Sequence, residues 1–389
     1  NNKWNKMTNK EYKKKLEIFN QLNLELKQKI DSTNLESFSR IKKYMKGKSI
    51  HIDRNIVTAH LDFEKIASFI ANDNEFYVVS GLNPSSDLHL GHKALFDFLL
   101  SLQKMGANIV IPITNDESYA DNKLKTLSAS RKRAYEKVIP NIIALGFDPK
   151  KTKLFVDSDY DFIYDFAMHI GKQIKLKQVE QLFGKSALQN ISQIFYRGTV
   201  QIAQILLPQL PEFGGPKNTL IPVGPDQHPY ITLSRKIAKK FDMTPPSEIC
   251  INFLQSLKNP GKKMSGSIAE TAIYLNDTPN NIKNKINKAY TGSLEKLSDH
   301  KKYGAIPEIC SVFQILRYHH PDNEFVNNVY DSYKKGKMGA SELKNLTIEF
   351  LVDMLNEHKT KVEKIKNIDE FILKKKLNSF LEYKGGKNE

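Results

Sequence analysis

Two short segments, far apart in the sequence, carry histidine, lysine, serine and glycine at spacings that suit phosphate chemistry. Residues 84–92 read PSSDLHLGH, so His89 and His92 are three positions apart, and residues 263–267 read KMSGS. Side chains at this spacing share one face of a helix. The start of a helix also offers unpaired N–H groups and the positive end of its dipole to an anion. The first segment therefore predicts a cradle for a polyphosphate.

The second segment predicts a mobile loop that brings a lysine onto the same phosphates. It follows Asn259, Pro260 and Gly261, which are residue types typical of turns. Lysine, small hydroxyl groups and glycine on such a loop can close over phosphates that are being transferred. Each segment alone has a simpler interpretation, a chance HxGH string in one case and a basic surface loop in the other. Their presence in one chain favours the phosphate site.

Three apolar segments are predicted to bring these and other polar residues to one place. They are residues 76–81 (FYVVSG), 108–114 (NIVIPIT) and 219–223 (TLIPV), and helical patterns separate them. Alternating strands and helices indicate an α/β fold, a Rossmann-like doubly wound parallel sheet covered on both faces. Ligands of such sheets lie beyond the carboxyl ends of the strands, where the strand order reverses.

The loops after these strands carry side chains that can hold a nucleoside and a small polar molecule. Gly81 and Gly224 allow a ligand to approach the backbone closely. Asp226 can accept hydrogen bonds from a ribose, and Gln227 offers a donor and an acceptor to a polar substrate. Glu117, in the segment TNDES, can accept from an ammonium group or an indole N–H. Capping of a helix start is the alternative role for Asp226 and Glu117.

The order of these patterns predicts three parts of the chain. Residues 1–55 form a Lys-rich helical extension, which we expect to pack on the catalytic domain, with a contribution to RNA binding as the alternative. Residues 56–274 form the Rossmann-like domain, with a helical insertion over about residues 118–215. Residues 275–389 form an all-helical domain, whose last predicted helix spans residues 365–381.

Composition narrows the choice of partners and compartment. The 389 residues include 59 Lys and Arg against 43 Asp and Glu, a net charge of +16. This favours a polyanionic partner, with a solvated Lys-rich surface as the alternative. The two cysteines, Cys250 and Cys310, lack metal-ligand spacing, so we predict neither a disulfide scaffold nor a protein-held metal. Without a signal-like segment or an apolar run of ~20 residues, we expect a cytoplasmic protein with no membrane attachment.

At this point the motifs resemble those of class I aminoacyl-tRNA synthetases, with HLGH in place of the family's HIGH and KMSGS in place of KMSKS. Residues 220–238 (LIPVGPDQHPYITLSRKIA) and 196–205 (YRGTVQIAQI) are similar to segments of the tryptophan-specific members. The resemblance covers about residues 55–320 and is strongest to the archaeal and eukaryotic branch of these tryptophanyl-tRNA synthetases.

The resemblance implies a role for each matching residue. The catalytic residues would be His89, His92, Lys263, Ser265 and Ser267. The ATP-binding residues would be Gly81, Pro84, Ser85, Gly91, Gly224, Asp226, Lys262 and Met264. The tryptophan pocket would be formed by Val79, Glu117, Gln201 and Gln227.

The resemblance also implies a two-step reaction and its partners. L-Tryptophan and ATP give tryptophanyl-adenylate and pyrophosphate, and tryptophan then passes to the terminal ribose of tRNA(Trp). Mg²⁺ would bridge phosphate oxygens rather than occupy a cage of protein ligands. The basic C-terminal helices are expected to contact the anticodon, and the helical insertion is expected to form the interface of a homodimer.

Several residues depart from the family pattern, and other functions stay open. Gly266 stands where the motif has its second lysine, which leaves the pyrophosphate to Lys263 and the histidines. Val79 stands where eukaryotic members place a tyrosine. Gln204 stands where an aspartate is common in both tryptophan and tyrosine enzymes, which favours tryptophan. The alternatives are a tyrosyl-tRNA synthetase, a non-catalytic tRNA-binding paralogue and a simple HxGH adenylyltransferase.

Overall fold

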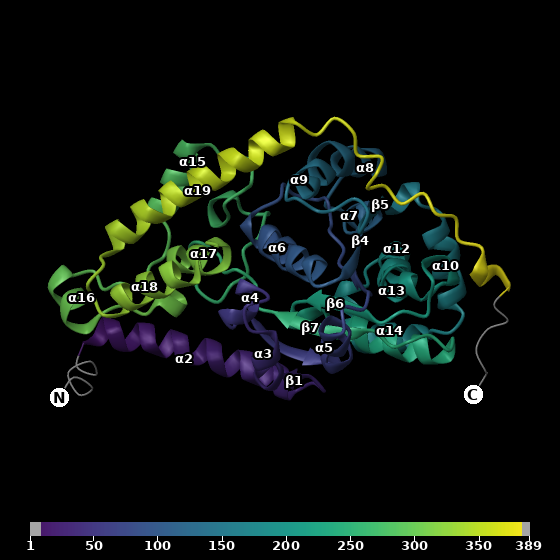
Figure 1. Ribbon diagram of the computed structural model, residues 1–389, viewed down its shortest axis with the longest axis horizontal. Helices are drawn as coiled ribbons and strands as arrows, with labels where there is room; N and C mark the ends of the chain where they lie inside the picture. The colour runs from purple at the N-terminus through teal and green to yellow at the C-terminus, as the bar shows by residue number, and fades with distance from the viewer. Residues whose placement is uncertain (1–8, 383–389) are drawn as a thin grey trace.

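The computed structural model describes residues 9–382 and has a seven-stranded sheet at its centre (Figure 1). The strand order is β1-β2-β7-β6-β3-β4-β5. The strands are β1 (Glu36–Ser37), β2 (Val57–Leu61), β3 (Phe76–Val79), β4 (Ala107–Ile113), β5 (Thr152–Val156), β6 (Thr219–Val223) and β7 (Ser247–Ile251). The pairs from β7 through β6, β3 and β4 to β5 are all parallel. This is the order of a doubly wound sheet, and it confirms the predicted fold.

The other edge of the sheet is antiparallel and was not predicted. β2 pairs antiparallel with β7, and the two-residue β1 pairs antiparallel with β2. Strand β7 also escaped prediction, because its sequence SEICI puts a glutamate where a buried strand normally has an apolar residue. The fold accommodates Glu248 there because His228 Nδ1 lies 2.7 Å from its Oε2.

Helices cover both faces of the sheet and bury an apolar core on each. Neighbouring residues of a strand contribute to opposite cores, Val78 to one and Val79 to the other, as the pleat requires. One core is covered by α5 (Phe63–Ala71), α6 (Leu90–Lys104) and α9 (Ile139–Ile143). The opposite core is covered by α10 (Phe162–Gly171), α13 (Gln201–Leu206) and α14 (His228–Lys240).

The predicted insertion, residues 118–215, is mostly helical but also contributes the edge strand β5. Its other helices include α7 (Asn115–Ala120), α8 (Leu127–Arg133), α11 (Leu176–Phe183) and α12 (Ile191–Phe195), with π-helical turns η1 (Ala134–Val138) and η4 (Tyr196–Val200). The helices α12, η4 and α13 run on without a break, so residues 191–206 form one helical rod.

The C-terminal part is helical as far as residue 363. It contains α15 (Pro279–Asn287), α16 (Leu297–Tyr303), α17 (Ser311–His319), α18 (Asn323–Lys334) and α19 (Ala340–Glu363). The side chains of α17 and α19 join the same core as α5 and α6, so this part packs directly on the sheet-covering helices.

The helix predicted over residues 365–381 is wrong. This segment is an extended strap that returns from α19 across the top of the molecule to the neighbourhood of α10, as Figure 1 shows in yellow. It follows the free edge of the sheet, where Leu154 N donates to Phe371 O at 2.7 Å and Leu373 N donates to Leu154 O at 2.8 Å. Among residues 9–382, no other strand pairs with β5 on that side, so its unpaired backbone groups favour an extended partner over a helix.

The N-terminal extension contacts both the catalytic part and the C-terminal part of the chain. Its elements are α2 (Lys10–Asp31), α3 (Ser39–Met45) and α4 (Ile50–Asp53), together with β1. Lys15 Nζ on α2 donates to Thr291 O at 2.9 Å, and the Leu22 side chain lies against Gly261. Residues 1–8 of the predicted extension and 383–389 of the predicted C-terminal domain lie outside the described residues.

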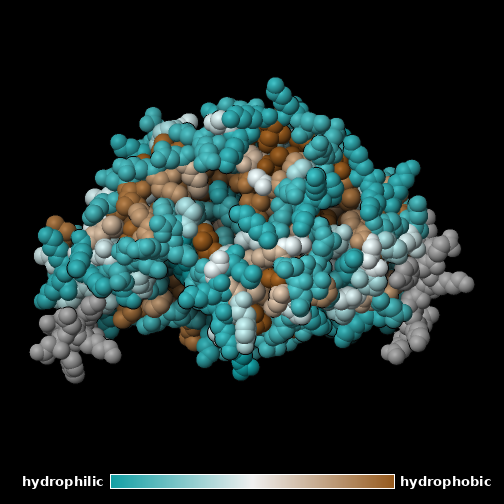
Figure 2. Space-filling view, in the orientation of Figure 1, coloured by the Kyte–Doolittle hydropathy of each residue, from teal (hydrophilic) through white to brown (hydrophobic). Residues whose placement is uncertain are grey.

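Among residues 9–382, no helix combines the length and the apolar character needed to cross a bilayer. The face drawn in Figure 2 is largely hydrophilic, and apolar side chains appear on it only in patches.

Candidate active site

A cavity of about 510 Å³ opens at the carboxyl ends of β3 and β6, where the strand order reverses. It is the position predicted for a ligand of this fold. Nine of the residues predicted for the site line it: Val79, Gly81, His92, Glu117, Gln201, Gly224, Asp226, Gln227 and Lys263. The strand ends and two distant loops therefore meet at one place.

The two histidines stand at the start of α6 with their rings stacked, 3.8 Å between centroids. His89 is the residue that caps the helix, and its Nδ1 accepts a hydrogen bond from Gly91 N at 3.1 Å. His92 Nδ1 accepts from His89 N at 3.3 Å. A neutral imidazole whose Nδ1 accepts carries its proton on Nε2. The backbone therefore fixes both rings as Nε2–H donors.

Both rings are held in the neutral form. Burial, with a smaller effect from the positive charge of Lys263, lowers the pKa of His89 to about 4. Burial and the neighbouring His89 hold the pKa of His92 well below its usual range. The pair can thus donate hydrogen bonds to phosphate oxygens at neutral pH, while the full positive charge comes from Lys263.

The loop of residues 263–267 packs against the start of α6. Met264 anchors it, with 1% of its side chain exposed and its N–H donating to Leu254 O at 2.9 Å. Lys263 extends toward the cavity, with Nζ 5.9 Å from the ring centre of Phe253. Ser265 and Ser267 hydroxyl oxygens are 2.9 Å apart.

Gly266 lies where no side chain fits in this loop conformation. A Cβ at this position would be 2.7 Å from Ser86 Cβ, and the Ser86 hydroxyl would be closer still. The carbonyl of Gly266 accepts a hydrogen bond from Tyr274 Oη at 2.9 Å, which holds the loop in place. The departure from the family's lysine is thus coupled to a close contact between the two motifs.

The remaining predicted residues belong to these loops but not to the cavity lining. They are His89, Pro84, Ser85, Gly91, Lys262, Met264, Ser265 and Ser267. The structure explains why residue 91 is a glycine, since a Cβ there would be 2.9 Å from His89 Cε1. Ser85 N donates to Asn83 Oδ1 at 3.1 Å, which shapes the turn before the histidines.

At the other end of the cavity, hydrogen bonds fix one carboxylate oxygen of Glu117 and leave the other without a donor. Its Oε2 accepts from Asn83 Nδ2 at 2.8 Å and from Thr114 Oγ1 at 3.0 Å, which leaves Oε1 for another donor. Burial raises the pKa of this carboxyl. Gln201 Nε2 lies 3.5 Å from Gln227 Oε1, and Gln227 Nε2 donates to Asp226 Oδ2 at 3.1 Å.

Asn83 and Arg197 also line the cavity, and the sequence did not single them out. Arg197 Nη2 contacts both carboxylate oxygens of Asp121, at 2.8 and 3.0 Å. Asn83 lies between two predicted site residues and Arg197 lies in the segment YRGTVQ, so proximity to the motifs was the available signal.

Two buried aspartates lie beside the amino-acid end of the cavity. Tyr164 Oη donates to Asp116 Oδ2 at 3.1 Å, and Gln204 Nε2 donates to Asp157 Oδ2 at 2.6 Å. Burial, and then the charge of Asp116, hold the pKa of Asp157 well above its usual range. Burial also raises the pKa of Asp116. Gln204 therefore serves as a neutral donor to a carboxyl group whose protonated form is favoured by burial.

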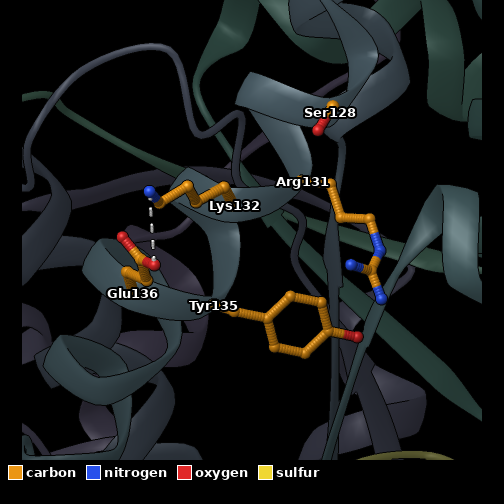
Figure 3. Close-up of a pocket in the computed structure, with 5 residues that line it drawn as sticks. All are labelled: Ser128, Arg131, Lys132, Tyr135 and Glu136. Carbon is orange, nitrogen blue, oxygen red and sulfur yellow. Dashed lines mark ion pairs between the residues drawn. The ribbon is translucent and has the colours of Figure 1, made fainter.

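A second hollow, of about 430 Å³, lies on the surface of the insertion (Figure 3). Its charged side chains are already paired. Arg131 Nε and Tyr135 Oη both contact Asp159, at 2.5 and 2.7 Å, and Lys132 Nζ lies 3.9 Å from Glu136 Oε1. Unlike the cavity at the strand ends, this hollow has no charged group left for a ligand.

Comparison with known proteins gives consistent matches. A family model described as tRNA synthetases class I (W and Y) matches residues 71–356. A tryptophan–tRNA ligase of Methanocaldococcus jannaschii is 38% identical over 329 residues, which cover 83% of this chain and 88% of that protein. One of Saccharolobus solfataricus is 36% identical over 85% of each chain. The solved tryptophanyl-tRNA synthetase of Aeropyrum pernix K1 matches with a TM-score of 0.79 and 29% identity over 86% of this chain and 92% of its own.

Proposed function

Because the chain belongs to the family of class I tRNA synthetases for tryptophan and tyrosine, we propose that the cavity at the strand ends is where its amino acid and ATP react. The activity is that of a tryptophan–tRNA ligase, which uses ATP, L-tryptophan and the tRNA as substrates. One observation carries the location of the site: the histidine turn, the lysine loop and the Glu117 pocket open into the same cavity.

The end of the cavity that holds the histidines and Lys263 carries out the first step, formation of the adenylate. A carboxylate oxygen of tryptophan attacks the α-phosphorus of ATP, the bond to the bridging oxygen breaks, and pyrophosphate leaves. His89 and His92 donate from Nε2 to phosphate oxygens, and Lys263 balances the charge that builds up on pyrophosphate. Asp226 accepts from the ribose. Mg²⁺ would enter with ATP as part of the substrate and would neutralise charge on the phosphates.

The opposite end selects the amino acid. The free Oε1 of Glu117 accepts from the indole N–H, while Gln201 and Gln227 bind the polar part of tryptophan. Val79 supplies apolar contact to the ring. An indole N–H suits this acceptor, since a buried carboxylate oxygen left without a donor would be costly.

The second step needs a surface for the tRNA. A cavity of about 990 Å³ between α3, α4, α17 and α18 is lined by five basic side chains, Lys42, Lys43, Lys46, Arg54 and Arg317. The acids in its lining are Asp53 and Glu308. An excess of basic groups suits a phosphate backbone. We place tRNA contacts here and along the neighbouring C-terminal helices, where the anticodon contacts were expected.

Quaternary structure, domain limits and compartment follow as proposals. The chain forms a homodimer through the helical insertion. Light scattering of the purified protein measures the mass of the assembly and so tests the dimer. Its parts are an extension (residues 1–55), the catalytic domain (56–274) and a C-terminal domain (275–389). The protein acts in the cytoplasm, which is supported by a Schizosaccharomyces pombe relative, 32% identical, that is named as the cytoplasmic enzyme.

Amino-acid-dependent exchange of pyrophosphate into ATP tests the specificity. We expect exchange with tryptophan and only background exchange with tyrosine or with no amino acid. Glu117→Gln should lower kcat/KM for tryptophan by about 10–100-fold, because the amide keeps the shape of the pocket but weakens the acceptor. Exchange with tyrosine alone would overturn the proposal.

A further inference from the structure

At the antiparallel edge of the sheet, one imidazole and two carboxylates face one another. Nitrogen or oxygen atoms of Glu36, His60 and Glu64 all lie within 4.8 Å of each other. The register of β1 against β2 places Glu36 opposite His60. Glu64 follows four residues later, in the first turn of α5. Three separate elements thus bring these groups together, on a side of the sheet that the cavity at the strand ends does not use.

The imidazole is buried, and one of its two nitrogens lacks a hydrogen-bond partner among the described residues. The His60 side chain is 1% exposed, and its Nδ1 has no hydrogen bond to any described residue. The nearest carboxylate oxygen, Glu64 Oε2, is 3.8 Å from Nδ1, beyond hydrogen-bond distance. Phe38 and Phe63 pack edge-on to the ring, with centroids at 5.9 and 6.4 Å, and hold its orientation. Buried polar atoms in folded proteins are normally satisfied, so this nitrogen indicates a missing partner.

The two glutamates are also free to take a cation. Within the part of the chain that the structure describes, neither forms an ion pair with a lysine or an arginine, and both side chains are exposed. The nearby Asp62 differs, because Arg235 Nη2 binds its Oδ2 at 2.6 Å. Two uncompensated carboxylates therefore remain beside one unpaired nitrogen.

We propose that His60, Glu36 and Glu64 bind a borderline divalent cation of the Zn²⁺ class. A nitrogen ligand with two carboxylate oxygens suits Zn²⁺, Co²⁺ or Mn²⁺, whereas Mg²⁺ and Ca²⁺ prefer oxygen alone. Zn²⁺ bound at about 2.0–2.2 Å holds its ligand atoms roughly 3.3 Å apart. The exposed glutamates can close that distance by rotation, while the buried imidazole stays in place. A water molecule completes the coordination.

Such a cation would connect β1, β2 and the start of α5. The two-residue β1 forms the edge of the sheet, and the cation would add to the attachment that the buried Leu35 and Phe38 on either side of it already provide. A cation that binds only when these elements are assembled stabilises the folded state and raises the unfolding temperature.

Zinc binding to the full chain, without nucleotide, tests the proposal. Isothermal titration with ZnCl₂ should give one more bound equivalent for the wild type than for Glu36→Gln/Glu64→Gln. The wild-type unfolding temperature should rise with Zn²⁺, and the double variant should lose most of that rise. Glu349→Gln, at an exposed position of α19, controls for loss of charge and should behave as the wild type. Both exchanged glutamates are exposed, so the fold should persist.

Two further measurements separate this site from others. Any Zn²⁺ that binds elsewhere on the chain should remain bound in the double variant. A tenfold molar excess of Mg²⁺ over Zn²⁺ should not displace the extra equivalent, because the imidazole selects against Mg²⁺. Equal zinc stoichiometry and equal stabilisation in wild type and double variant would overturn the proposal, and so would ready displacement by Mg²⁺.

Discussion

Gly266 provides the sharpest test of how the two motifs cooperate. In the present loop conformation an alanine Cβ would lie 2.7 Å from Ser86 Cβ, about 1 Å inside an ordinary carbon–carbon contact. Rotation of the Ser86 hydroxyl does not remove this conflict, because Cβ moves only with the backbone. The loop must therefore shift, at a cost typical of overpacking, about 1–3 kcal/mol. We expect Gly266→Ala to lower the pyrophosphate-exchange rate by about 5–150-fold, since 1.4 kcal/mol is tenfold.

The cost should depend on Ser86. Ser86→Gly removes both atoms that the new Cβ meets, so Gly266→Ala should cost much less in that background. The four proteins form a double-mutant cycle measured by tryptophan-dependent exchange, and we expect a coupling of about 1 kcal/mol or more. Gly266→Lys, which restores the family's residue, should also lose activity in the wild-type background. Simple additivity of the two single changes, or full activity of Gly266→Ala, would refute this account of the loop.

Three further predictions concern the lysine loop, the buried aspartates and the RNA surface. Lys263→Ala should reduce pyrophosphate exchange by about 10²–10³-fold with the fold intact, and Lys262→Ala should lose far less, because only Lys263 lines the cavity. In urea titrations between pH 5 and 8.5, Asp157→Asn should flatten the pH dependence of unfolding. The raised pKa of Asp157 gives stability that is complete below about pH 4 and declines as pH rises through the folded-state pKa, by up to about 1.4 kcal/mol per pH unit. Lys43→Ala/Lys46→Ala should raise KM for tRNA and reduce the salt dependence of binding while exchange stays unchanged.

Each of these predictions has its own control. For exchange, circular dichroism and the unfolding midpoint establish that the Lys263 variant is folded, and an unchanged rate would remove its assigned role. For the pH series, parallel curves for wild type and Asp157→Asn would contradict the raised pKa of Asp157. For the RNA surface, Lys236→Ala/Lys239→Ala on α14 removes the same charge elsewhere, and an equal effect on KM would contradict a specific surface.

The sequence predicted the parts of the fold and site that depend on local patterns. Three of the parallel strands, most helices and the positions of the histidine turn and lysine loop follow from periodicity and turn-forming residues. The meeting of Glu117, Asp226 and Lys263 in one cavity also followed, because parallel strands end at one edge. Their roles in the reaction stay predictions for the experiments above.

Contacts between distant segments were beyond the reach of these patterns. The strap after α19 was predicted as a helix. It is extended because its backbone pairs with the edge strand β5 and not with its own sequence neighbours, and the local pattern does not report that pairing. Strands β2 and β7 carry polar residues that only their partners make tolerable, as His228 does for Glu248.

By itself, then, the sequence determined the doubly wound sheet and the residue types at its strand ends, because strand and helix periods and turn chemistry are local properties. Only the tertiary structure decided the donor tautomers of His89 and His92, the need for glycine at position 266, and the cluster around His60. The physical reason is common to all three. Each depends on an atom whose partner is set by backbone position or by packing between separate segments. The distance between such an atom and its partner is not encoded in a linear pattern of residue types.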